Sequence, residues 1–583
     1  MASHQLLVRQ RASWVLVGLA GAAGLLTARL IYLQLISGPS LAALAVAQRT
    51  KIVDLSSVRG EIVDRNGRAL AASVEAYSVY ASPRDARSFD PASTAQRLAP
   101  VLGLKQHELQ AKLQGKHFRW LYRLADDRVY KKVRALKLPG VGIVRESKRI
   151  YPKGRLAATL IGFVGVDNQG LAGIEHAFDK VLRGPQQKVR VEVDAYGREI
   201  MREGSHKLLD AYLSGGSRVV LTIDENLQHV AERELGVAIK DSGARRGAII
   251  MMDPRTGDLL AFATLPTYDP NHFGKYNWQD IKNWAVTDVY EPGSTMKCFT
   301  VAAALEHKRV TTRTVFTCPE RITVDGRTVS EHDSGVGTRQ LTPSDIIEVS
   351  SNVGTSQMAF RLSPAQHRRF LHRLGFGVTT GSGITGESKG VVPGLPWRRL
   401  TQATISYGQG ISATPLQVLT AAAALGNGGV RMVPRLIDRV VSNKGELLET
   451  FPVKTAATCM SPATAQAVVT MMEQVVERGT GLEARVPGFW VGGKTGTAQR
   501  VRDDGFGYSD DVVASFVGLA PSKAPRFAIL TLLDAPRKVH WASMTAAPLF
   551  ARVAEAALRQ AGVQPTRPLT PPAEPSRKLP RGE

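Results

Sequence analysis

Three short patterns combine serine, lysine and asparagine at spacings that suit acyl transfer. They are Ser294-x-x-Lys297, Ser350-x-Asn352 and a K-T-G-T run that begins at Lys494, and each occurs once in the sequence. An isolated S-x-x-K is far more often the capped, solvated start of a helix than a nucleophile. The presence of all three patterns in this order favours a serine nucleophile with a lysine base.

Helix geometry explains the spacing of Ser294 and Lys297. Positions i and i+3 lie on one face of a helix, so the Lys297 amine can reach the Ser294 hydroxyl. The dipole and free N–H groups at a helix N-terminus favour a developing oxyanion and disfavour a protonated lysine. Burial acts in the same direction, so we expect Lys297 to be neutral enough to act as base. Pro292-Gly293 predicts a tight, exposed entry that presents Ser294.

The second pattern supplies a hydroxyl and an amide. Ser350 can relay a proton, and Asn352 can orient Lys297 or hold a substrate amide.

The third pattern predicts an edge strand that receives an extended peptide. Lys494 adds a fixed positive charge, and the strand offers backbone groups, with the Thr497 N–H completing an oxyanion hole. The hydroxyls of Thr495 and Thr497 suit a substrate carboxylate.

A phosphate-binding loop is the competing interpretation of the same lysine. Residues 488–495, "GFWVGGKT", match G-x-x-x-x-G-K-[ST], and residues 529–534 resemble an acidic-ended strand of an NTPase. A phosphate loop needs a flexible Gly-rich turn that leads directly into a helix. Phe-Trp-Val fills this turn and no helical pattern follows, so the sequence disfavours nucleotide binding.

The elements around these motifs predict an α+β fold with a largely antiparallel sheet. Residues 247–264 show two apolar runs around a P-R-T-G turn, which indicates a hairpin. A strand is expected at 527–535, an amphipathic helix at 226–243 and an Ala-rich helix at 542–561. Residues 411–426 predict a helix with Thr414 as N-cap and Pro415 at its first position.

The region before residue 215 contains no catalytic cluster. Residues 58–73 indicate a strand, an N-G turn and a strand, whereas residues 151–184 indicate a short helix, a Gly-rich loop and another helix. We interpret this basic region as a folded, non-catalytic pedestal, joined to the rest by a linker at 213–218.

The N-terminus predicts a membrane anchor. Residues 14–36 carry only one charge, Arg29, and as a helix they would measure about 35 Å, enough to cross a bilayer. Arg29 must snorkel or meet a polar partner. Arg9 and Arg11 precede the run, and no basic residue follows before Arg49, so the N-terminus is expected inside and the rest outside. A signal peptide cut near "AVA" at 45–47 is the alternative.

Composition sets outer limits on function. Of the 583 residues, 43% are hydrophobic and 22% charged, and the formal charge of +24 would attract polyanions. No nucleic-acid-binding signature accompanies this charge. The three cysteines, Cys298, Cys318 and Cys459, form no CxxC or Cys/His cluster, so a zinc site is not expected, although one disulfide stays open.

Taken together, these motifs resemble the penicillin-binding proteins that cross-link peptidoglycan. The resemblance covers almost the whole chain from the anchor to about residue 560. Besides the three patterns, it is carried by "RGEIVDRNGRALAAS", "YPKGRLAATLIGFVG", "DPRTGDLLAFAT", "EPGSTMK", "SSNVGTS" and "YGQGISATPLQ". The single anchor and non-catalytic pedestal are similar to class B members, and no glycosyltransferase domain of class A is visible. Within class B the chain is most similar to the division-specific, FtsI-like type, with the elongation-specific type as near neighbour.

The resemblance implies a fold, a domain order and a location. The fold is an α+β, β-lactamase-like transpeptidase domain with an antiparallel sheet flanked by helices, an elongated pedestal and one transmembrane helix. The expected order is a cytoplasmic N-terminus (1–13), an anchor (14–36), a dimerisation-type pedestal (49–215), the transpeptidase domain (216–563) and a disordered Pro-rich tail (564–583). The protein would sit in the cytoplasmic (inner) membrane at the division site, with its catalytic domain in the periplasm.

The resemblance also implies a reaction and its participants. Ser294 would attack the D-Ala-D-Ala amide of a stem peptide, and an amine from a neighbouring stem would resolve the acyl-enzyme. Lys297, Ser350, Asn352 and Lys494 would be catalytic, while Thr495, Gly496 and Thr497 would bind substrate. No metal or cofactor is implied. Expected partners are peptidoglycan stem peptides, lipid-linked precursor polymer, β-lactams as inhibitors, and an FtsW-like glycan polymerase with other divisome membrane proteins.

Two rival functions stay open. One is a serine hydrolase of the carboxypeptidase or β-lactamase type, against which the pedestal argues. The other is a receptor or scaffold that recognises penicillin, against which the three intact motifs argue. Cys298, directly after Lys297, is expected to be a small buried packing residue.

Overall fold

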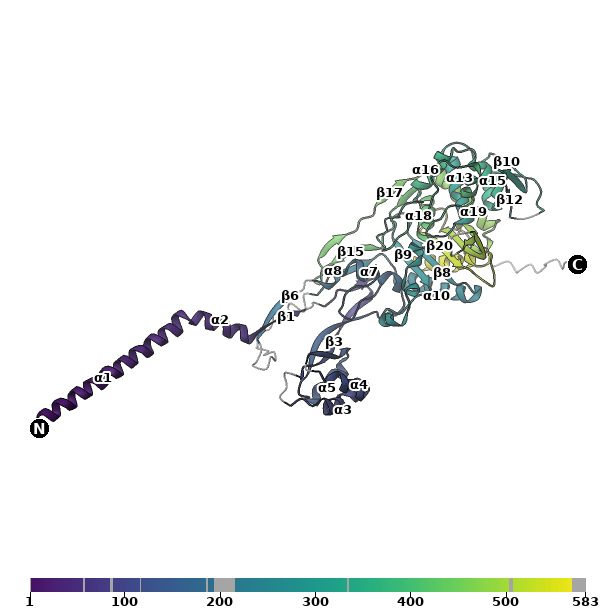
Figure 1. The fold of residues 1–583 in the computed structure, drawn as a ribbon. Helices are drawn as coiled ribbons and strands as arrows, with labels where there is room; N and C mark the ends of the chain where they lie inside the picture. Colours follow the sequence, from purple (N-terminus) through teal and green to yellow (C-terminus); the bar gives the residue numbers. More distant parts are fainter. Residues whose placement is uncertain are drawn as a thin grey trace. The chain divides into compact units, whose positions relative to one another are not determined.

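The chain is described by a computed structural model that covers residues 2–55, 58–83, 88–115, 117–184, 187–192, 215–332, 335–502 and 507–568. It forms two compact units (Figure 1). The first comprises Met1–Val58, Glu75–Ser147 and Gly184–Gly215, and the second comprises Arg59–Val74, Lys148–Arg183 and Gly216–Glu583. Of the C-terminal tail predicted to be disordered, residues 569–583 fall outside the described residues.

The first unit begins with a long apolar helix. α1 (Ala2–Ile31) is followed by a π-helical turn, η1 (Tyr32–Ile36), and by α2 (Gly38–Arg49). The stretch Leu6–Ile36 is long and apolar enough to cross a membrane, and its most apolar window is not buried at all. No other helix in the part of the chain that the structure describes meets the same criteria. This stretch contains the anchor predicted from the sequence.

The rest of the first unit is a small α+β body. The end of β3 (Ala69–Ala81) pairs with β4 (Arg119–Ala125), and β3 also pairs with β5 (Val141–Ile150). Leucines and valines from the sheet and from three helices form its core; the helices are α3 (Pro91–Leu102), α4 (Gln106–Leu113) and α5 (Asp127–Leu136). β1 (Thr50–Leu55) pairs antiparallel with β6 (Gln187–Glu192).

The second unit has a sheet at its N-terminal end. β2 (Ile62–Val63) pairs with the start of β3 across the predicted N-G turn, and it runs parallel to β7 (Arg218–Leu221). The sheet continues through β15 (Ile437–Val441) to β16 (Leu447–Thr450). The strand–turn–strand prediction for residues 58–73 is therefore confirmed.

A buried ion-pair network fixes this region of the second unit. Arg59 is fully buried, and its guanidinium donates to Glu175 at 2.6 Å and to Asp179 at 2.7 Å. Arg149 donates to the other Glu175 oxygen at 2.7 Å. Buried charges are costly unless they are paired and hydrogen-bonded. The network satisfies this requirement and joins the segment 58–73 to α7 (Gly173–Ala177) and α8 (Asp179–Arg183).

A five-stranded antiparallel sheet forms the centre of the second unit. Its order is β18 (Gly492–Val501), β19 (Tyr508–Ala520), β20 (Phe527–Asp534), β8 (Arg246–Met252) and β9 (Leu259–Leu265). Among the strands that the structure describes, β18 pairs only with β19, so it is an edge strand. The antiparallel sheet and the β8–β9 hairpin confirm the α+β prediction.

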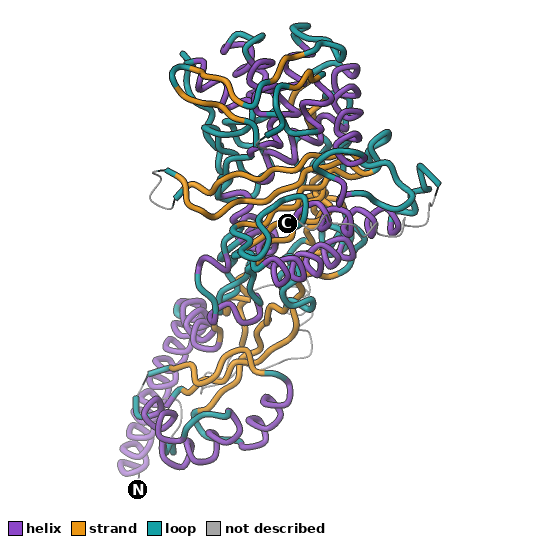
Figure 2. The backbone as a smooth tube through the Cα atoms, turned by 90° about the vertical axis from the view of Figure 1, so that its right-hand side faces the viewer, coloured by secondary structure: helices purple, strands orange, loops and turns teal. Residues whose placement is uncertain are grey.

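Helices cover both faces of this sheet (Figure 2). Alternate residues of each strand face opposite sides. One face packs against α10 (Glu225–Ser242) and α20 (Ala546–Gln560), and the other packs against α18 (Pro415–Gly426) and neighbouring helices.

The ends of these helices follow capping rules. Thr414 caps α18 with Pro415 at its first position, and Gly243 closes α10 in the left-handed conformation, as the sequence predicted. α20 starts at Ala546, later than predicted, because residues 542–545 form a turn in which the Ala542 N–H donates to the Thr497 hydroxyl.

The remaining elements of the second unit are α6 (Ala158–Ile161), η3 (Pro270–Lys275), α11 (Trp278–Ile281), α12 (Trp284–Thr287), η4 (Gly293–Thr295), α13 (Met296–Glu306), β10 (Phe316–Cys318), β11 (Arg321–Val324), β12 (Arg327–Ser330), β13 (Arg339–Leu341), α14 (Pro343–Glu348), α15 (Asn352–Ala359), α16 (Pro364–Arg373), α17 (Arg399–Ser406), β14 (Val430–Met432), β17 (Thr455–Thr458), α19 (Pro462–Glu477) and η5 (Leu482–Ala484).

All three cysteines are buried and free, and Cys298 packs in the core, as predicted.

Candidate active site

Ser294 lies in a 3-10 turn, η4, directly before helix α13. Ser294 is half-buried, and the preceding residue, Gly293, is buried. Gly293 has a φ of 58°, in the left-handed region that favours glycine. A Cβ at this position would lie 3.1 Å from the Cβ of Ala498, and the Gly293 N–H donates to the carbonyl of Gly408 at 3.1 Å. The turn therefore matches the tight entry that the sequence predicts, but the prediction that the entry is exposed is wrong, because Pro292 and Gly293 are both buried against the rest of the unit.

Lys297 is fully buried in the first turn of α13 and points to the second motif. Its amine donates to the Ser350 hydroxyl at 3.1 Å and also to the Ser350 carbonyl. Ser350 has a φ of 60°, a left-handed conformation that is uncommon outside glycine. Two motifs far apart in the sequence thus meet through direct hydrogen bonds. Within the described residues, no hydrogen bond joins Lys297 to Ser294.

Asn352 begins helix α15 beside these residues. Its side-chain amide donates to the carbonyl of Ser330 at 3.0 Å, and its backbone N–H donates to the Glu331 carboxylate at 2.8 Å. The same carboxylate accepts a hydrogen bond from the Ser351 hydroxyl, which also caps α15. In the described structure Asn352 makes no hydrogen bond to Lys297, so a direct orienting contact, one of the two roles expected for it, is not seen.

The K-T-G-T run lies on the edge strand β18. Lys494 is fully buried, and its amine donates to the Thr495 carbonyl and hydroxyl, both at 3.2 Å. The Thr495 hydroxyl also lies 2.9 Å from that of Thr480, and the Thr497 hydroxyl accepts from the Ala542 N–H at 3.3 Å. The hydroxyls proposed to bind a carboxylate are therefore already held in place by protein groups.

β18 packs directly against the Ser294 turn. A Cβ added to Gly496 would lie 2.8 Å from the Pro292 carbonyl oxygen and 2.9 Å from the Thr295 methyl group. Only glycine allows this approach of strand and turn. All three motifs therefore surround one site, as the sequence predicted.

Burial shifts the protonation of both lysines. The pKa of Lys297 is held well below its ordinary value, first by burial and then by the charge of Lys494, while Glu331 opposes the shift. Burial lowers the pKa of Lys494 to about 8. The shift favours the neutral amine of Lys297, which is the form that a general base needs.

The structure also brings in residues that sequence reasoning missed. Glu331 supports the second motif, Thr480 supports Lys494, and Gly408 receives the Ser294 turn. Gly408 belongs to the quoted "YGQGISATPLQ" stretch, so the sequence did contain a signal for this residue. Glu331 and Thr480 gave none, because nothing in their local sequence indicates a distant partner.

An aromatic pair joins the segment after Glu331 to the segment before Ala542. The rings of His332 and Trp541 meet edge to face, with centroids 4.8 Å apart. His332 follows Glu331, whereas Trp541 precedes Ala542, whose N–H donates to Thr497. Both rings are exposed.

The phosphate-loop interpretation is excluded by the backbone. Lys494 lies within strand β18, which begins at Gly492, and not at the start of a helix. Nor do the described residues contain a group of three or more His, Cys, Asp or Glu side chains able to hold a metal ion.

Comparison with known proteins places this site in a family. The penicillin binding protein transpeptidase domain matches residues 247–555, and the penicillin-binding protein dimerisation domain matches residues 54–210. The chain belongs to the penicillin-binding protein transpeptidases.

Relatives of this transpeptidase match it over nearly its full length. The probable peptidoglycan D,D-transpeptidase PenA of Neisseria gonorrhoeae is 33% identical over 96% of this chain and 94% of its own. Peptidoglycan D,D-transpeptidase FtsI of Escherichia coli is 33% identical over 95% of this chain and 93% of its own.

Solved structures agree with the sequence comparison. A penicillin-binding protein 3 of Mycobacterium tuberculosis, in complex with aztreonam, superposes with a TM-score of 0.68 at 29% identity, over 89% of this chain and 99% of that one. A peptidoglycan synthetase from Bifidobacterium adolescentis gives a TM-score of 0.70 at 28% identity, over 90% and 98% of the two chains.

Proposed function

We propose that this chain is a peptidoglycan D,D-transpeptidase that cross-links stem peptides through a serine acyl-enzyme. One observation carries the proposal. Lys297, which lies one helical turn after Ser294, is fully buried and donates a hydrogen bond to Ser350, and its pKa is well below the ordinary value. Relatives that cover nearly the whole chain are named D,D-transpeptidases.

In the first step Ser294 is the nucleophile. Its oxygen attacks the carbonyl carbon of the penultimate D-Ala, and its proton passes to the neutral amine of Lys297. The oxyanion is stabilised by backbone N–H groups, among which we assign those of Ser294 and Thr497. Collapse breaks the C–N bond, and the Ser350 hydroxyl relays a proton from Lys297 to the departing D-Ala amine.

Lys494 and its strand would hold the substrate. An extended peptide adds to the free edge of β18, which Gly496 allows to lie close to the Ser294 turn. The charge of Lys494 attracts the terminal carboxylate, while Thr495 and Thr497 present their hydroxyls. Asn352 is assigned to the substrate amide.

In the second step an amine resolves the acyl-enzyme. The amine of a neighbouring stem attacks the ester carbonyl, loses a proton to the Lys297–Ser350 pair and releases Ser294. Water in place of the amine would give a carboxypeptidase or β-lactamase reaction. Product analysis with and without an acceptor amine distinguishes the two, since a hydrolase yields the same free acid in both.

Replacing the nucleophile tests this assignment. In Ser294→Ala, covalent labelling by a fluorescent penicillin should disappear while the melting temperature stays the same, because a half-buried hydroxyl contributes little to stability. Thr470→Ala, which removes an exposed hydroxyl on α19, is the control and should label normally. Labelling that survives in Ser294→Ala would place the nucleophile elsewhere.

We propose a role in septal wall synthesis during cell division. The relation to FtsI supports this role, and it makes an FtsW-like glycan polymerase and other divisome membrane proteins the expected partners. The N-terminus is assigned to the cytoplasm and the catalytic domain to the periplasm, because Arg9 and Arg11 precede the apolar stretch. Septal enrichment of a fluorescent fusion in dividing cells would favour division, whereas lateral-wall enrichment would favour elongation.

A further inference from the structure

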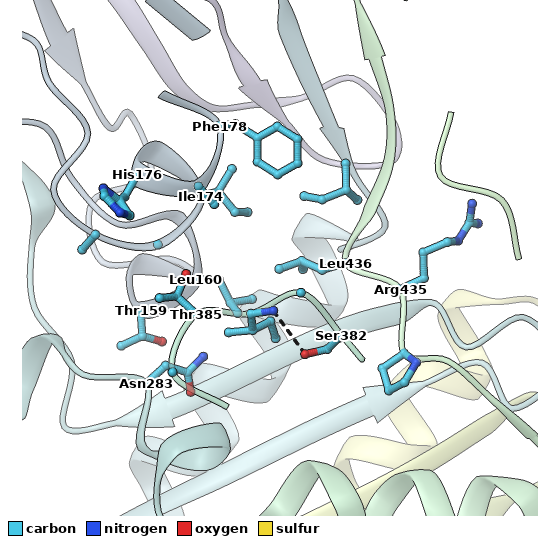
Figure 3. A pocket seen from close by; sticks show the side chains of 18 of the residues that line it. Thr159, Leu160, Ile174, His176, Phe178, Asn283, Ser382, Thr385, Arg435 and Leu436 are labelled. Carbon is cyan, nitrogen blue, oxygen red and sulfur yellow. Dashed lines mark hydrogen bonds between the residues drawn. The ribbon is translucent and has the colours of Figure 1, made fainter. Parts of the chain in front are cut away.

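The second unit contains a cavity of about 650 Å³ that no residue of the candidate active site lines. Four segments of this unit enclose it: residues 159–178, 278–287, 381–386 and 433–454 (Figure 3). Ligand sites in proteins usually measure about 300–1,000 Å³. The cavity is therefore large enough for a small organic molecule or a dipeptide.

The walls of the cavity are mostly apolar. Leu160, Ile174 and Leu436 line it and are buried, and Phe178 meets Phe451 edge to face at a centroid distance of 5.9 Å. Water gains few hydrogen bonds against such walls, so an apolar occupant is favoured over solvent.

One buried polar side chain in the wall has no partner. Asn283 is 7% exposed, and neither its Oδ1 nor its Nδ2 atom has a hydrogen-bond partner in the described structure. Asn283 precedes α12, where an Asn side chain normally accepts from the backbone N–H groups of the first turn. The Asn283 side chain makes no such bond. Only the backbone carbonyl of Asn283 accepts from the N–H groups of Val286 and Thr287, both at 3.3 Å. A buried amide left unpaired in a native protein requires an explanation.

Several charged and polar groups around the cavity are already paired. Lys282 bonds to Asp288, and Arg435 bonds to Asp258 at 2.6 Å. The Ser382 hydroxyl accepts from a backbone N–H at 3.2 Å. Lys282 and Arg435 are thus compensated within the protein, and two further lining charges, Glu449 and Lys454, are exposed and opposite in sign, which favours a neutral ligand over an ion.

We propose that this cavity is a second binding site, which takes a compact apolar ligand carrying a neutral amide. The ligand N–H would donate to Asn283 Oδ1, and the ligand carbonyl would accept from Asn283 Nδ2. The apolar body would fill the space between Leu160, Ile174 and Leu436. The same pairing serves a free small molecule or an apolar side chain with its peptide group.

Two probes that differ in a single group test the proposal. 3-Phenylpropanamide carries the amide, and 4-phenyl-2-butanone replaces its NH₂ with CH₃ at nearly equal size. Binding is measured by saturation-transfer NMR titration of the full-length protein in detergent, acylated beforehand with penicillin so that Ser294 is blocked. The amide should bind saturably and about tenfold tighter than the ketone, the effect of one to two net hydrogen bonds.

Variants locate the binding and assign the preference. Ile384→Trp fills the cavity from its lining loop and should abolish binding of both probes. Val391→Trp places the same ring at an exposed position outside the cavity and should change nothing. Asn283→Leu should bind the amide and the ketone equally, an outcome that a purely structural role of Asn283 does not predict.

Three results would overturn the proposal: no saturable binding at millimolar amide, equal affinities of both probes for the native protein, or unchanged binding in Ile384→Trp. The melting temperature and penicillin labelling check that each variant is folded. If Asn283→Leu does not fold, Asn283→Asp replaces it: loss of the Nδ2 donor removes the bond to the carbonyl that both probes carry, so both should bind more weakly, while the preference for the amide, which depends on the Oδ acceptor, should remain.

Discussion

Lys297 and Lys494 are both fully buried, yet their surroundings suit different tasks. Lys297 bonds to Ser350, and both burial and the charge of Lys494 lower its pKa. Lys494 bonds to threonine oxygens, and burial lowers its pKa to about 8. Two like charges in one buried site disfavour each other. We therefore assign the neutral base to Lys297 and the positive charge to Lys494.

Removing each amine should separate the two tasks. Lys297→Ala should slow acylation by penicillin at least about 10²-fold, the size of a general-base contribution. Lys494→Ala should chiefly weaken capture of the carboxylate, raising the concentration needed for half-maximal acylation. Stopped-flow acylation kinetics measure both, with the exposed Lys444→Ala as control. Near-normal acylation by Lys297→Ala would rule out its role as base.

The lysine pKa values predict how acylation depends on pH. Because burial holds the pKa of Lys297 well below its ordinary value, the acylation rate constant should stop rising at a lower pH than an ordinary lysine base, with a pKa of about 10.4, would give. Lys494 is charged below its pKa of about 8 and loses this charge above it, so apparent affinity for penicillin should fall above about pH 8.

Penicillin methyl ester is the control for the affinity change. It lacks the carboxylate that Lys494 would attract, so its apparent affinity should stay flat across the same pH range. An equal fall for acid and ester would show that Lys494 does not act through the carboxylate.

At the scale of elements, the catalytic geometry rests on the packing of the Ser294 turn against strand β18. Gly293 and Gly496 lack the Cβ atoms that would collide across this contact. The left-handed conformation of Gly293 turns the chain from Pro292 into η4, which sets the position of Ser294.

Gly293→Ala should therefore damage the site beyond its cost in backbone strain. A left-handed alanine costs about 1–2 kcal/mol, and the new Cβ would press on Ala498 at 3.1 Å. Displacement of the nucleophile by a fraction of an ångström to 1 Å can lower the rate about 10²-fold. Gly326→Ala is the matched control, because Gly326 has a φ of 75° and open space around its Cβ position.

Acylation rates and thermal unfolding of the two variants decide the matter. We expect both variants to lose a similar amount of stability, and we expect only Gly293→Ala to lose acylation. Normal acylation by Gly293→Ala would show that the turn tolerates displacement.

At the scale of the whole molecule, one apolar stretch carries the membrane assignment. Leu6–Ile36 has the length and hydropathy of a span, and its most apolar window is not buried by other parts of the chain. The three motifs lie far beyond it in the sequence, and their contacts involve only residues of the second unit. Acylation and membrane placement should therefore be separable.

Removing the anchor tests this separation. A chain that starts at residue 40 should stay soluble and be acylated by penicillin at the native rate, but it should fail to support division. Replacing residues 14–36 with an unrelated single-pass helix should restore division if the span is only a tether. Continued failure at normal expression and topology would indicate specific helix contacts, including those of Arg29. Recovery of the native protein as a soluble form beginning near Gln48 would refute the anchor.

Features that depend on neighbours in the sequence were predictable. The Thr414 cap, the Gly243 terminus, the β8–β9 hairpin and the apolar stretch all follow from local conformational preference and periodicity. The three motifs could also be recognised, because serine, lysine and asparagine rarely combine at these spacings for purely structural reasons.

The tertiary structure alone decided which groups complete the site. Glu331, Thr480 and the Lys297–Ser350 bond join residues distant in sequence, and no local pattern encodes such a contact. The lowered lysine pKa values likewise depend on how much protein surrounds each amine, which is a property of packing. The sequence by itself thus determined the chemistry available to this protein, and folding determined the protonation and position in which that chemistry operates, because burial and long-range contacts exist only in the assembled core.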